Sequence, residues 1–353
     1  MKTEKYVFIS YLDPDYSRSS VFLTDKRKQN YYFWKVQGTK LGKLKSLVAL
    51  SIKYSRARTI FIVMSPCHSL VIPLRFLTSR PIILDAGWSL TEALQVRNLS
   101  KKYFAHRILT YTIDFLSFHL SNISLFESNQ QCIWIQNKFR LRKSKTFSIL
   151  TGFNESRYVN LNPEMPVELS ERSEFQEDYV LFRGSFTNEA GLDLLYKVSQ
   201  VENSLGKRFV IATNRDFGYF KNCKNVILIQ RKLSESEIKF LYLNCSLAIG
   251  QLRNTLRLSN TIPHKAFEAA YFARPYLTAD ATGIREFLSS DNQAIFTKSE
   301  DVEYLADLLG RTIEDRKFLI TTGVMAKKRY EQVASQEKLQ DQFSIELKRL
   351  NRI

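Results

Sequence analysis

Apolar and polar residues alternate along this chain in the pattern typical of a parallel α/β sheet. Short apolar runs, which predict buried strands, are separated by longer stretches whose apolar residues recur at helical spacing. Strands are expected over residues 6–11, 31–36, 59–65, 81–85, 123–126, 179–182, 209–212, 226–229, 246–249 and 276–278. Helices are expected over residues 40–54, 101–117, 128–139, 191–202, 234–243, 263–272 and 312–350. Strands and helices therefore alternate twice, once in each half of the chain.

The alternation breaks over residues 160–178, where Pro163 and Pro166 precede a run of acidic residues with few apolar ones between them. A length of 353 residues leaves room for two domains with separate cores. We expect a Rossmann-like domain over 1–158, a linker over 159–178, a second such domain over 179–330 and a C-terminal helix over 331–353. Two open parallel sheets joined by one linker imply a cleft between the domains, and ligands of such sheets bind at the carboxyl ends of the strands.

Composition excludes several classes of protein. Apolar residues at 44%, with 12 Gly and 8 Pro, are incompatible with a collagen-like or wholly disordered chain. The four cysteines form no CxxC pair, so we expect free thiols rather than disulfides or a structural zinc site. The best candidate for a membrane span, residues 59–77, is interrupted by proline, histidine and arginine. Because a span needs about 20 apolar residues, we expect a strand, a loop and a helix there instead.

The positive charge is concentrated in one half of the chain. Residues 1–155 contain 24 Lys and Arg against 9 Asp and Glu, whereas residues 156–353 contain 28 against 26. This asymmetry indicates that the first domain faces an anionic partner, which could be nucleic acid, a phospholipid surface or a phosphorylated acceptor. The richest basic runs lie at 26–28, 40–58 and 138–145. For any single run, a solvated surface is the simpler interpretation.

The sharpest chemical signal lies at the start of the helix expected over 263–272. Pro263 suits the first turn of a helix, and Lys265 beside a helix N-terminus is suited to binding a diphosphate. Glu268, one turn further on, could accept hydrogen bonds from ribose hydroxyls. Arg274-Pro275 then leads into the next strand. The alternative is an ordinary amphipathic helix with Lys265 and Glu268 in solvent.

In their order, these segments resemble the retaining GT-B glycosyltransferases of glycosyltransferase family 4. In that family a Lys-x-x-Glu helix start and an Arg-Pro strand form the nucleotide-sugar site, and Lys265, Glu268 and Arg274-Pro275 match it. The further segments that look like family motifs are 121–128, 149–154, 180–185, 189–191 and 282–286. The resemblance covers nearly the whole chain. It implies a GT-B fold with the acceptor domain first, the donor domain second and a last helix that crosses back onto the first domain.

The chain departs from the family pattern at three points. The first of the family's two paired glutamates corresponds to Asn260, so only Glu268 is kept. The family's diphosphate-binding lysine corresponds to Ala190, which leaves Arg183 or Lys265 to hold the phosphates. The His or Asp that the family often has near the reacting centre corresponds to Asp85.

The resemblance implies Asp85 and Asn260 as candidate catalytic residues, with Asp85 orienting or deprotonating the acceptor. A strand-end Asp that caps a turn is the alternative for Asp85. The candidate donor-binding residues are Arg183, Gly184, Ser185, Arg231, Thr261, Ile262, His264, Lys265 and Glu268. Arg183, Lys265 and a helix N-terminus would neutralise the leaving diphosphate without a metal. Residues 13–15 spell a DxD motif, for which a turn is the better interpretation than a metal site.

The expected function is retaining, metal-independent transfer of a hexose-type unit from a nucleotide diphosphate sugar, with a UDP-sugar favoured. The acceptor would be a saccharide, a glycolipid or another envelope component, as in polysaccharide biosynthesis, and no cofactor is expected. The alternatives are an inactive GT-B scaffold or partner-binding protein and, given aromatic residues among basic ones, a nucleic-acid-binding protein. No nucleic-acid motif supports the last alternative. We expect a cytoplasmic protein whose basic half attaches it to the anionic inner face of the cell membrane.

Overall fold

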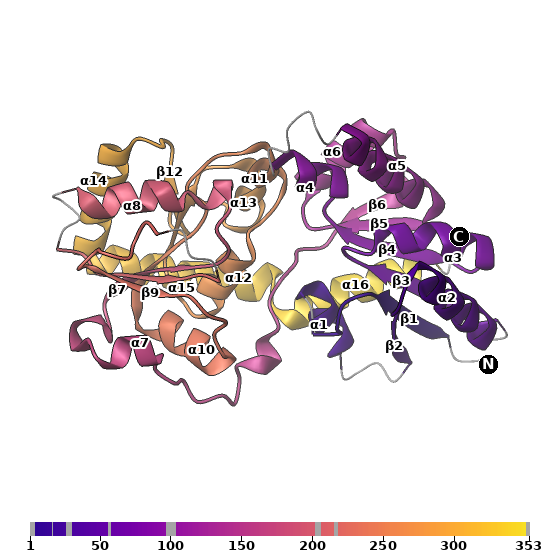
Figure 1. The fold of residues 1–353 in the computed structure, drawn as a ribbon, viewed down its shortest axis with the longest axis horizontal. Helices are drawn as coiled ribbons and strands as arrows, with labels where there is room; N and C mark the ends of the chain where they lie inside the picture. The colour runs from indigo at the N-terminus through magenta and orange to yellow at the C-terminus, as the bar shows by residue number, and fades with distance from the viewer. Residues whose placement is uncertain are drawn as a thin grey trace. The chain divides into compact units, whose positions relative to one another are not determined.

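The structure is a computed structural model that describes residues 4–15, 17–25, 30–55, 58–96, 104–201, 206–214 and 218–350. The chain divides into two compact units (Figure 1). Unit 1 comprises residues 1–152 and 336–353, and unit 2 comprises residues 153–335. Each unit contains one six-stranded sheet in which all the paired strands run parallel. The prediction of an α/β chain with two Rossmann-like sheets is therefore confirmed.

The sheet of unit 1 has the strand order β2-β1-β3-β4-β5-β6. Its strands are β1 (Lys5–Ser10), β2 (Tyr31–Lys35), β3 (Thr59–Met64), β4 (Ile82–Gly87), β5 (Ile123–Phe126) and β6 (Thr146–Ser148). Every residue of β3, β4 and β5 is buried. Continuous apolar runs of this kind form central strands because helices cover both faces of a parallel sheet.

The helices of unit 1 cover its sheet on both faces. The core on one face includes residues of α2 (Lys40–Tyr54), α3 (Val71–Leu77), α5 (Phe104–Leu120) and α6 (Asn129–Phe139). The core on the other face includes residues of α1 (Ser17–Leu23) and α16 (Gln336–Leu350). The short helix α4 (Leu90–Val96) follows β4.

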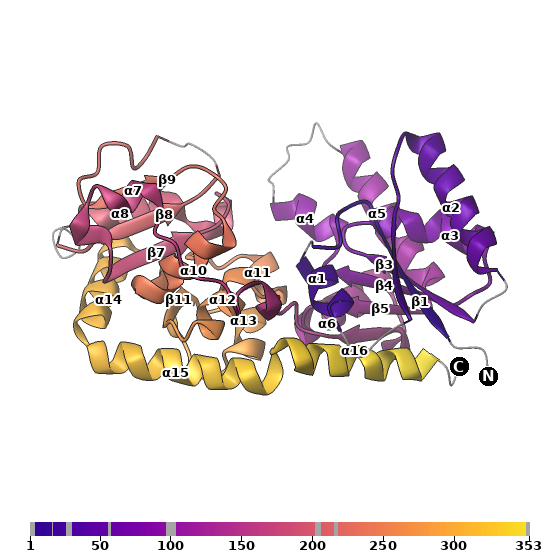
Figure 2. The same ribbon diagram turned by 90° about the horizontal axis from the view of Figure 1, so that it is seen from below.

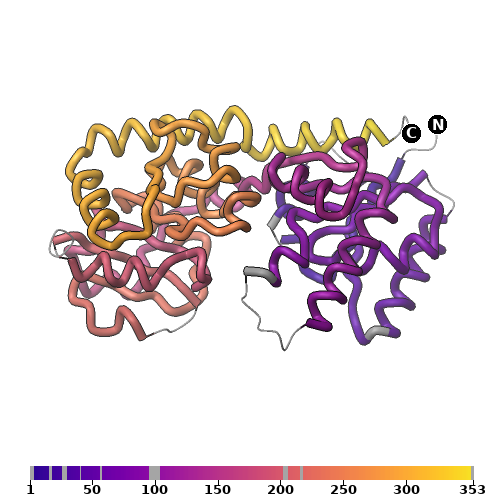
Figure 3. The backbone as a smooth tube through the Cα atoms, turned by 90° about the horizontal axis from the view of Figure 1, so that it is seen from above, coloured from indigo at the N-terminus to yellow at the C-terminus, as the bar shows by residue number. Residues whose placement is uncertain are grey.

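The last helix, α16, packs in unit 1 although it comes from the end of the chain (Figure 3). Its Phe343 stacks on Phe22 of α1 with ring centroids 4.3 Å apart, and both rings are buried. The helix that precedes it, α15 (Arg316–Val333), belongs to unit 2. The segment 331–353, expected as one helix, is thus the end of α15 followed by α16.

The sheet of unit 2 has the strand order β12-β11-β10-β7-β8-β9. Its strands are β7 (Tyr179–Arg183), β8 (Phe209–Ala212), β9 (Val226–Ile229), β10 (Cys245–Ile249), β11 (Tyr276–Ala279) and β12 (Ile295–Thr297). Its α-helices are α7 (Val167–Ser170), α8 (Leu192–Gln200), α10 (Glu235–Asn244), α11 (Leu256–Asn260), α12 (His264–Tyr271), α13 (Thr282–Phe287), α14 (Val302–Glu314) and α15. A capping box formed by Ser234 and Glu237 begins α10.

The stretch 159–178, expected as a linker, is instead packed into unit 2. Leu169 of α7 is fully buried and Phe175 is 1% exposed. These two apolar residues among the acidic ones anchor the stretch, and the division between the units falls earlier, between Gly152 and Phe153. No helix in the described part of the chain is long and apolar enough to cross a membrane.

Candidate functional site

The order of strands reverses in unit 2 between β7 and β10. From β7 the chain adds β8 and β9 on one side of the sheet, whereas β10 and β11 lie on the other side. Figure 2 labels β7, β8, β9 and β11 of this sheet. In open parallel sheets, ligands bind at the carboxyl ends of the strands at such a switch point. The strand β7 ends at Arg183, and β10 is followed at once by Gly250. Any ligand site of this kind in unit 2 therefore starts from these two strand ends.

A buried glutamate on α12 is surrounded by donors from β7, from α10 and from its own helix. Glu268 is 2% exposed, and its carboxylate accepts hydrogen bonds from Nε and a terminal nitrogen of Arg183. The hydroxyl of Tyr242, at the end of α10, donates to Oε2 at 2.8 Å. Nδ1 of His264, one turn earlier on α12, lies 3.3 Å from Oε1. We call these four residues together with Lys265 the Glu268 cluster.

Arg183 keeps Glu268 ionised inside the protein. Burial by itself would raise the pKa of a carboxyl group, because it removes water from the charged form. The Arg183 guanidinium and the hydrogen bonds to His264 and Arg183 outweigh this and hold the pKa of Glu268 well below its usual range. The cluster therefore contains a permanent ion pair at the carboxyl end of β7.

Lys265 is a buried amine next to this ion pair. The residue is 8% exposed, its Nζ lies 3.8 Å from the centroid of the Phe182 ring, and it donates to the carbonyl oxygen of Gly250 at 3.4 Å. Burial, reinforced by the positive charge of Arg183, lowers the pKa of Lys265 to about 7. Since Lys265 and Glu268 are both buried, the alternative that both lie in solvent is wrong. The amine lies between the ends of β7 and β10, at the switch point of the sheet.

The loop after β7 contributes Glu189 to a second ion pair, with Arg257 of α11. Gly184 has φ +153°, and a Cβ there would lie 3.5 Å from Nζ of Lys265, so the backbone passes close to that amine. Ser185 is exposed, and Ala190, at the position of the family's lysine, is buried. Beside it, Glu189 is 4% exposed, and its Oε2 lies 3.5 Å from a terminal nitrogen of Arg257 on α11. Arg257 thus adds a cation to this part of unit 2.

The residues just before α12 are held by a close approach of α13. Asn260, Thr261 and Ile262 are all buried, and the hydroxyl of Thr261 donates to the carbonyl of Arg257 at 3.0 Å. Gly283, in the first turn of α13, faces this segment: a Cβ there would lie 2.6 Å from the carbonyl oxygens of Leu258 and Thr261. Only glycine fits such a contact, so Gly283 determines the path of the chain into α12.

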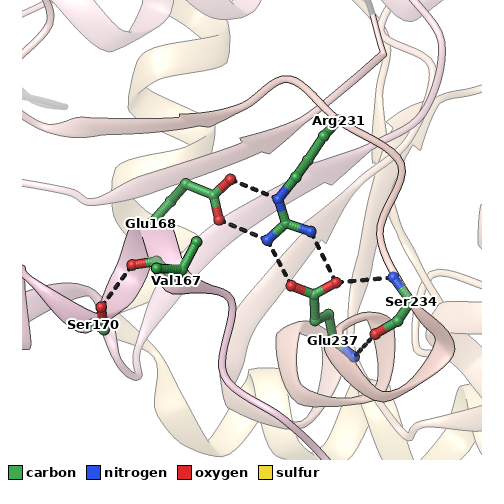
Figure 4. A network of polar contacts seen from close by, with 6 residues as sticks. All are labelled: Val167, Glu168, Ser170, Arg231, Ser234 and Glu237. Atoms are coloured by element: carbon green, nitrogen blue, oxygen red, sulfur yellow. Dashed lines mark hydrogen bonds and ion pairs between the residues drawn. The ribbon is translucent and has the colours of Figure 1, made fainter.

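Arg231 lies in a different network (Figure 4). Its guanidinium makes paired hydrogen bonds to the carboxylates of Glu168 on α7 and of Glu237 on α10, at 2.6–3.0 Å. These bonds hold the packed stretch before β7 against the start of α10. Arg231 was expected in the same donor site as Glu268, but the structure does not bring it into the Glu268 cluster.

Asp85 is enclosed in the core of unit 1. Its side chain is fully buried on β4 and forms an ion pair with Arg18 of α1 at 2.8 Å. Arg18 also donates to the backbone carbonyl of Ile149 at 2.6 Å. Burial raises the pKa of Asp85, and the charge of Arg18 opposes that rise. A cavity of about 50 Å³ beside the pair is bounded by Trp88 and Glu127 among others.

The DxD motif at residues 13–15 is not joined by further metal ligands in the described residues. Asp13 of the DxD motif pairs with Lys35. Over the described ranges of the chain, no three His, Cys, Asp or Glu side chains converge as metal ligands would.

Sequence reasoning missed three residues that the structure places at these sites: Tyr242, Arg257 and Arg18. Tyr242 lies 26 residues from its partner Glu268, and Arg18 lies 67 residues from Asp85. No local spacing pattern connects residues so far apart. For Tyr242 the order of elements offered one signal: it lies near the end of α10, and α10 leads directly into β10 at the switch point.

Comparison with solved structures shows the class of fold. The chain superposes over 98% of its length on 99% of HepE from Anabaena in its complex with UDP-glucose, with a TM-score of 0.70 and 14% identity. Sucrose-phosphate synthase from Thermosynechococcus elongatus matches 99% of the chain over its own full length, with a TM-score of 0.73 and 12% identity. TarM matches 85% of the chain over 57% of its own length, with a TM-score of 0.61 and 15% identity.

These structures are GT-B glycosyltransferases, and this chain has their fold along its full length. No family model matches the sequence. No curated protein matches it either. At identities of 10–15% the superpositions establish the fold, and the chemistry of this chain has to be argued from its own residues.

Proposed function

We propose that this protein is a retaining glycosyltransferase that transfers a sugar from a UDP-sugar to a hydroxyl group of a saccharide or glycolipid. The observation that carries the proposal is the Glu268 cluster at the switch point of unit 2. A buried carboxylate, a buried amine and a guanidinium meet where parallel sheets bind nucleotides. Buried charges of this kind are costly unless a ligand or a partner uses them.

The diphosphate of the donor would be held by the cations of unit 2. Lys265 and Arg183 flank the end of β7, and Arg257 adds a third positive charge nearby. As the bond between sugar and diphosphate breaks, negative charge develops on the leaving group. Cations that are already fixed in place stabilise that charge without any reorganisation. This supports a reaction that needs no metal ion.

The ribose hydroxyls would bind Glu268 by exchange with an existing donor. A carboxylate has about four acceptor positions, and here Arg183, Tyr242 and His264 already supply four donor contacts. The contact from His264 is the longest of the four, at 3.3 Å, and the His264 side chain is 44% exposed. We propose that a ribose hydroxyl takes the place of His264 when the donor binds.

Asn260 would contact the donor sugar with its amide, because it lies at the end of α11 immediately before the segment that leads into α12.

Asp85 has a narrower proposed role than sequence reasoning assigned to it. A carboxylate that is fully buried and paired with Arg18 is suited to positioning Arg18 rather than to removing a proton from an acceptor. Unit 1 is proposed to bind the acceptor.

Nucleotide binding is the first test. The melting temperature of the full chain is measured with UDP, GDP, ADP and CMP, since a ligand at about 100 times its Kd stabilises the folded state by about 2.7 kcal/mol. We expect a rise with UDP that is lost in Lys265→Met and kept in the matched control Lys317→Met, an exposed lysine of α15. No rise with any nucleotide would contradict the proposal.

The second arm separates an enzyme from an inactive scaffold. UDP-glucose is incubated with the protein, and released UDP is followed with and without candidate glycans. The replacement of the family's glutamate by Asn260 and of its lysine by Ala190 favours the scaffold alternative. UDP binding without release of UDP from any sugar donor would support a scaffold.

A further inference from the structure

The helix α2 of unit 1 is apolar on two opposite sides. Its inner side places Leu47, Leu50 and Tyr54 in the core. Its outer side carries Leu41, Leu44, Val48 and Ile52, which recur every three or four residues and are 36–69% exposed. A surface helix normally needs only one apolar stripe, facing the core. In the part of unit 1 that the structure describes, the outer stripe of α2 does not belong to either hydrophobic core.

The helix α5 has an inverted pattern. Three of its four buried residues are polar: Thr110, Asp114 and Ser117. Its exposed residues include Phe104, Ile108, Leu109, Tyr111, Phe115 and Leu116, which are 37–68% exposed. A helix that buries polar groups and exposes large apolar ones is suited to an apolar environment outside the protein.

These two helices belong to one continuous layer. α2 packs on α3, and α3 packs on α5, all on the same side of the sheet (Figure 2). Between them Phe76, at the end of α3, is 83% exposed. We call the outward surfaces of α2, α3 and α5 the outer face of unit 1. Apolar patches of this breadth on a protein surface mark sites of interaction.

Among the described residues, the exposed charged side chains of α2, α3 and α5 are all basic. Unit 1 contains 28 Lys and Arg against 11 Asp and Glu, a net charge of +17, whereas unit 2 contains 24 of each. Between residues 26 and 154 the chain has only four carboxylates, Asp85, Glu92, Asp114 and Glu127, and all four are buried. Lys45 and Lys53 of α2, Arg107 of α5 and Lys138 of α6 are exposed. The basic run 26–28 lies outside the described residues.

We propose that the outer face of unit 1 docks on an anionic lipid bilayer, with the apolar stripes of α2 and α5 inserted into the interface and the surrounding lysines and arginines on the headgroups. A helix that lies in the plane of the interface has an apolar face and a basic polar face. The cations gain attraction near anionic lipid, and among the described residues α2, α3 and α5 present no exposed carboxylate that would repel it.

Rings occur on the outer face at Phe76 of α3 and at Phe104, Tyr111 and Phe115 of α5, and it is the stripe of α2 that favours lipid over nucleic acid. Single-stranded nucleic acid is held by aromatic rings on which bases stack. The outer stripe of α2 consists only of leucine, valine and isoleucine, which offer bases no ring to stack on. Aliphatic side chains gain most from transfer out of water into a hydrocarbon environment.

If the proposed function also holds, this surface identifies the class of acceptor. A donor site in unit 2 and a membrane-docked unit 1 would suit an acceptor that is itself held at the bilayer, such as a lipid-linked saccharide. This consequence rests on the proposed function, whereas docking itself does not.

Vesicle sedimentation tests the docking surface with the full chain. Vesicles of phosphatidylcholine, alone or mixed with phosphatidylglycerol, are spun down at low and high salt. The inserting variant, Ile52→Gln with Ile108→Gln, makes polar two of the side chains that are proposed to insert. Its matched control is Ile345→Gln on α16 with Ile320→Gln on α15, where the two isoleucines are 52% and 67% exposed. A charge variant, Lys45→Glu with Lys53→Glu, completes the set.

We expect sedimentation with the anionic vesicles only, weakened by salt. The inserting and charge variants should each lower the partition coefficient at least about tenfold, and the control pair should leave it within about twofold. Sedimentation that the charge variant abolishes but the inserting variant leaves intact would overturn the proposal, because it would show adsorption by charge alone.

Three other results would also overturn it: no sedimentation with anionic vesicles, tight binding of poly(U) in place of vesicles, or a dimer in solution that the inserting variant dissociates. The UDP-dependent melting shift of the inserting variant is measured in parallel. It reports on unit 2, so a failure of docking and a failure of nucleotide binding are read out separately.

Discussion

The two units share one architecture and use their charges in opposite ways. Each is a six-stranded parallel sheet covered by helices, with the strand order reversing once. Unit 2 has equal numbers of acidic and basic residues and buries some of them, in the Glu268 cluster, at the switch point of its sheet. Unit 1 carries the whole net charge of +17 and has large apolar residues exposed on α2 and α5.

The difference shows that fold and charge placement are separable. A parallel sheet requires apolar strands and helices that cover its faces, and both units meet that requirement. The remaining surface and the strand ends are free to carry chemistry. In unit 2 the chemistry is concentrated in a small buried volume, whereas in unit 1 it is spread over an outer surface.

The largest expected effect concerns the packing of α16 in unit 1. Phe343→Ala should lower the free energy of unfolding of unit 1 by about 4 kcal/mol, because a buried ring that stacks on Phe22 is lost. The three tryptophans, Trp34, Trp88 and Trp134, all lie in unit 1, so urea unfolding followed by their fluorescence reports on that unit.

The matched control is Ile345→Ala, on the exposed side of the same helix, where a change of no more than about 0.5 kcal/mol is expected. Equal effects of the two variants would show that α16 does not depend on this contact.

The second effect concerns the buried ion pair of unit 2. Glu268→Ala should destabilise unit 2 by about 3 kcal/mol, because it leaves the guanidinium of Arg183 partly buried without its carboxylate. Hydrogen exchange of amides in β7 and β10 measures the change within unit 2.

Glu300→Ala is the control, since Glu300 pairs with Arg253 at the surface with 48% of its side chain exposed. Exposed pairs contribute less than about 1 kcal/mol. A small effect at Glu268 would mean that its partners are readily resolvated and that the cluster is not preorganised.

The third effect concerns the close approach of α13 to the segment before α12. Gly283→Ala should destabilise unit 2 by about 2 kcal/mol, because the added methyl group meets two backbone carbonyl oxygens that cannot move aside. Gly206→Ala, where a Cβ would meet nothing within 4 Å, should be close to neutral. Thermal melting of both variants checks this, and a neutral Gly283→Ala would exclude the tight contact.

The fourth effect is a pH dependence of the proposed nucleotide binding. The charged form of Lys265 attracts the diphosphate, and its pKa is about 7, so raising the pH removes the charge and weakens binding. The affinity for UDP should fall about tenfold between roughly pH 7.5 and 8.5. Calorimetric titration measures it, and Lys265→Arg, which stays charged, should flatten the profile. A flat profile in the unchanged protein would show that Lys265 does not meet the phosphates.

The smallest expected effect is that of a substitution on the outer stripe of α2, which is compared with one on the inner side. Ile52→Gln, on the outer stripe, should change the stability of unit 1 by no more than about 0.5 kcal/mol, whereas Leu47→Gln, on the inner side, should cost more than about 2 kcal/mol. Tryptophan fluorescence in urea again provides the measurement. A large loss at Ile52 would mean that the outer stripe is part of the folding core.

The sequence predicted most of the elements because their patterns are local. The strands β3, β7 and β9 start and end within a residue or two of their expected limits. The stretch 159–178 was predicted as a linker because it is rich in acidic residues and contains two prolines. Two apolar residues within it, Leu169 and Phe175, are buried, and their burial depends on the rest of unit 2. Short-range composition does not show which apolar residues find a core.

By itself, the sequence determined the alternation of strands and helices, the concentration of positive charge in the first half and the spacing that sets Lys265 and Glu268 on one helix. Only the tertiary structure decided that Arg183, 85 residues away, pairs with Glu268, and that burial brings the pKa of Lys265 to about 7. It also decided which side of α2 faces outward. The physical reason is that spacing along the chain sets local structure, whereas partners, burial and exposure depend on contacts between residues far apart in sequence.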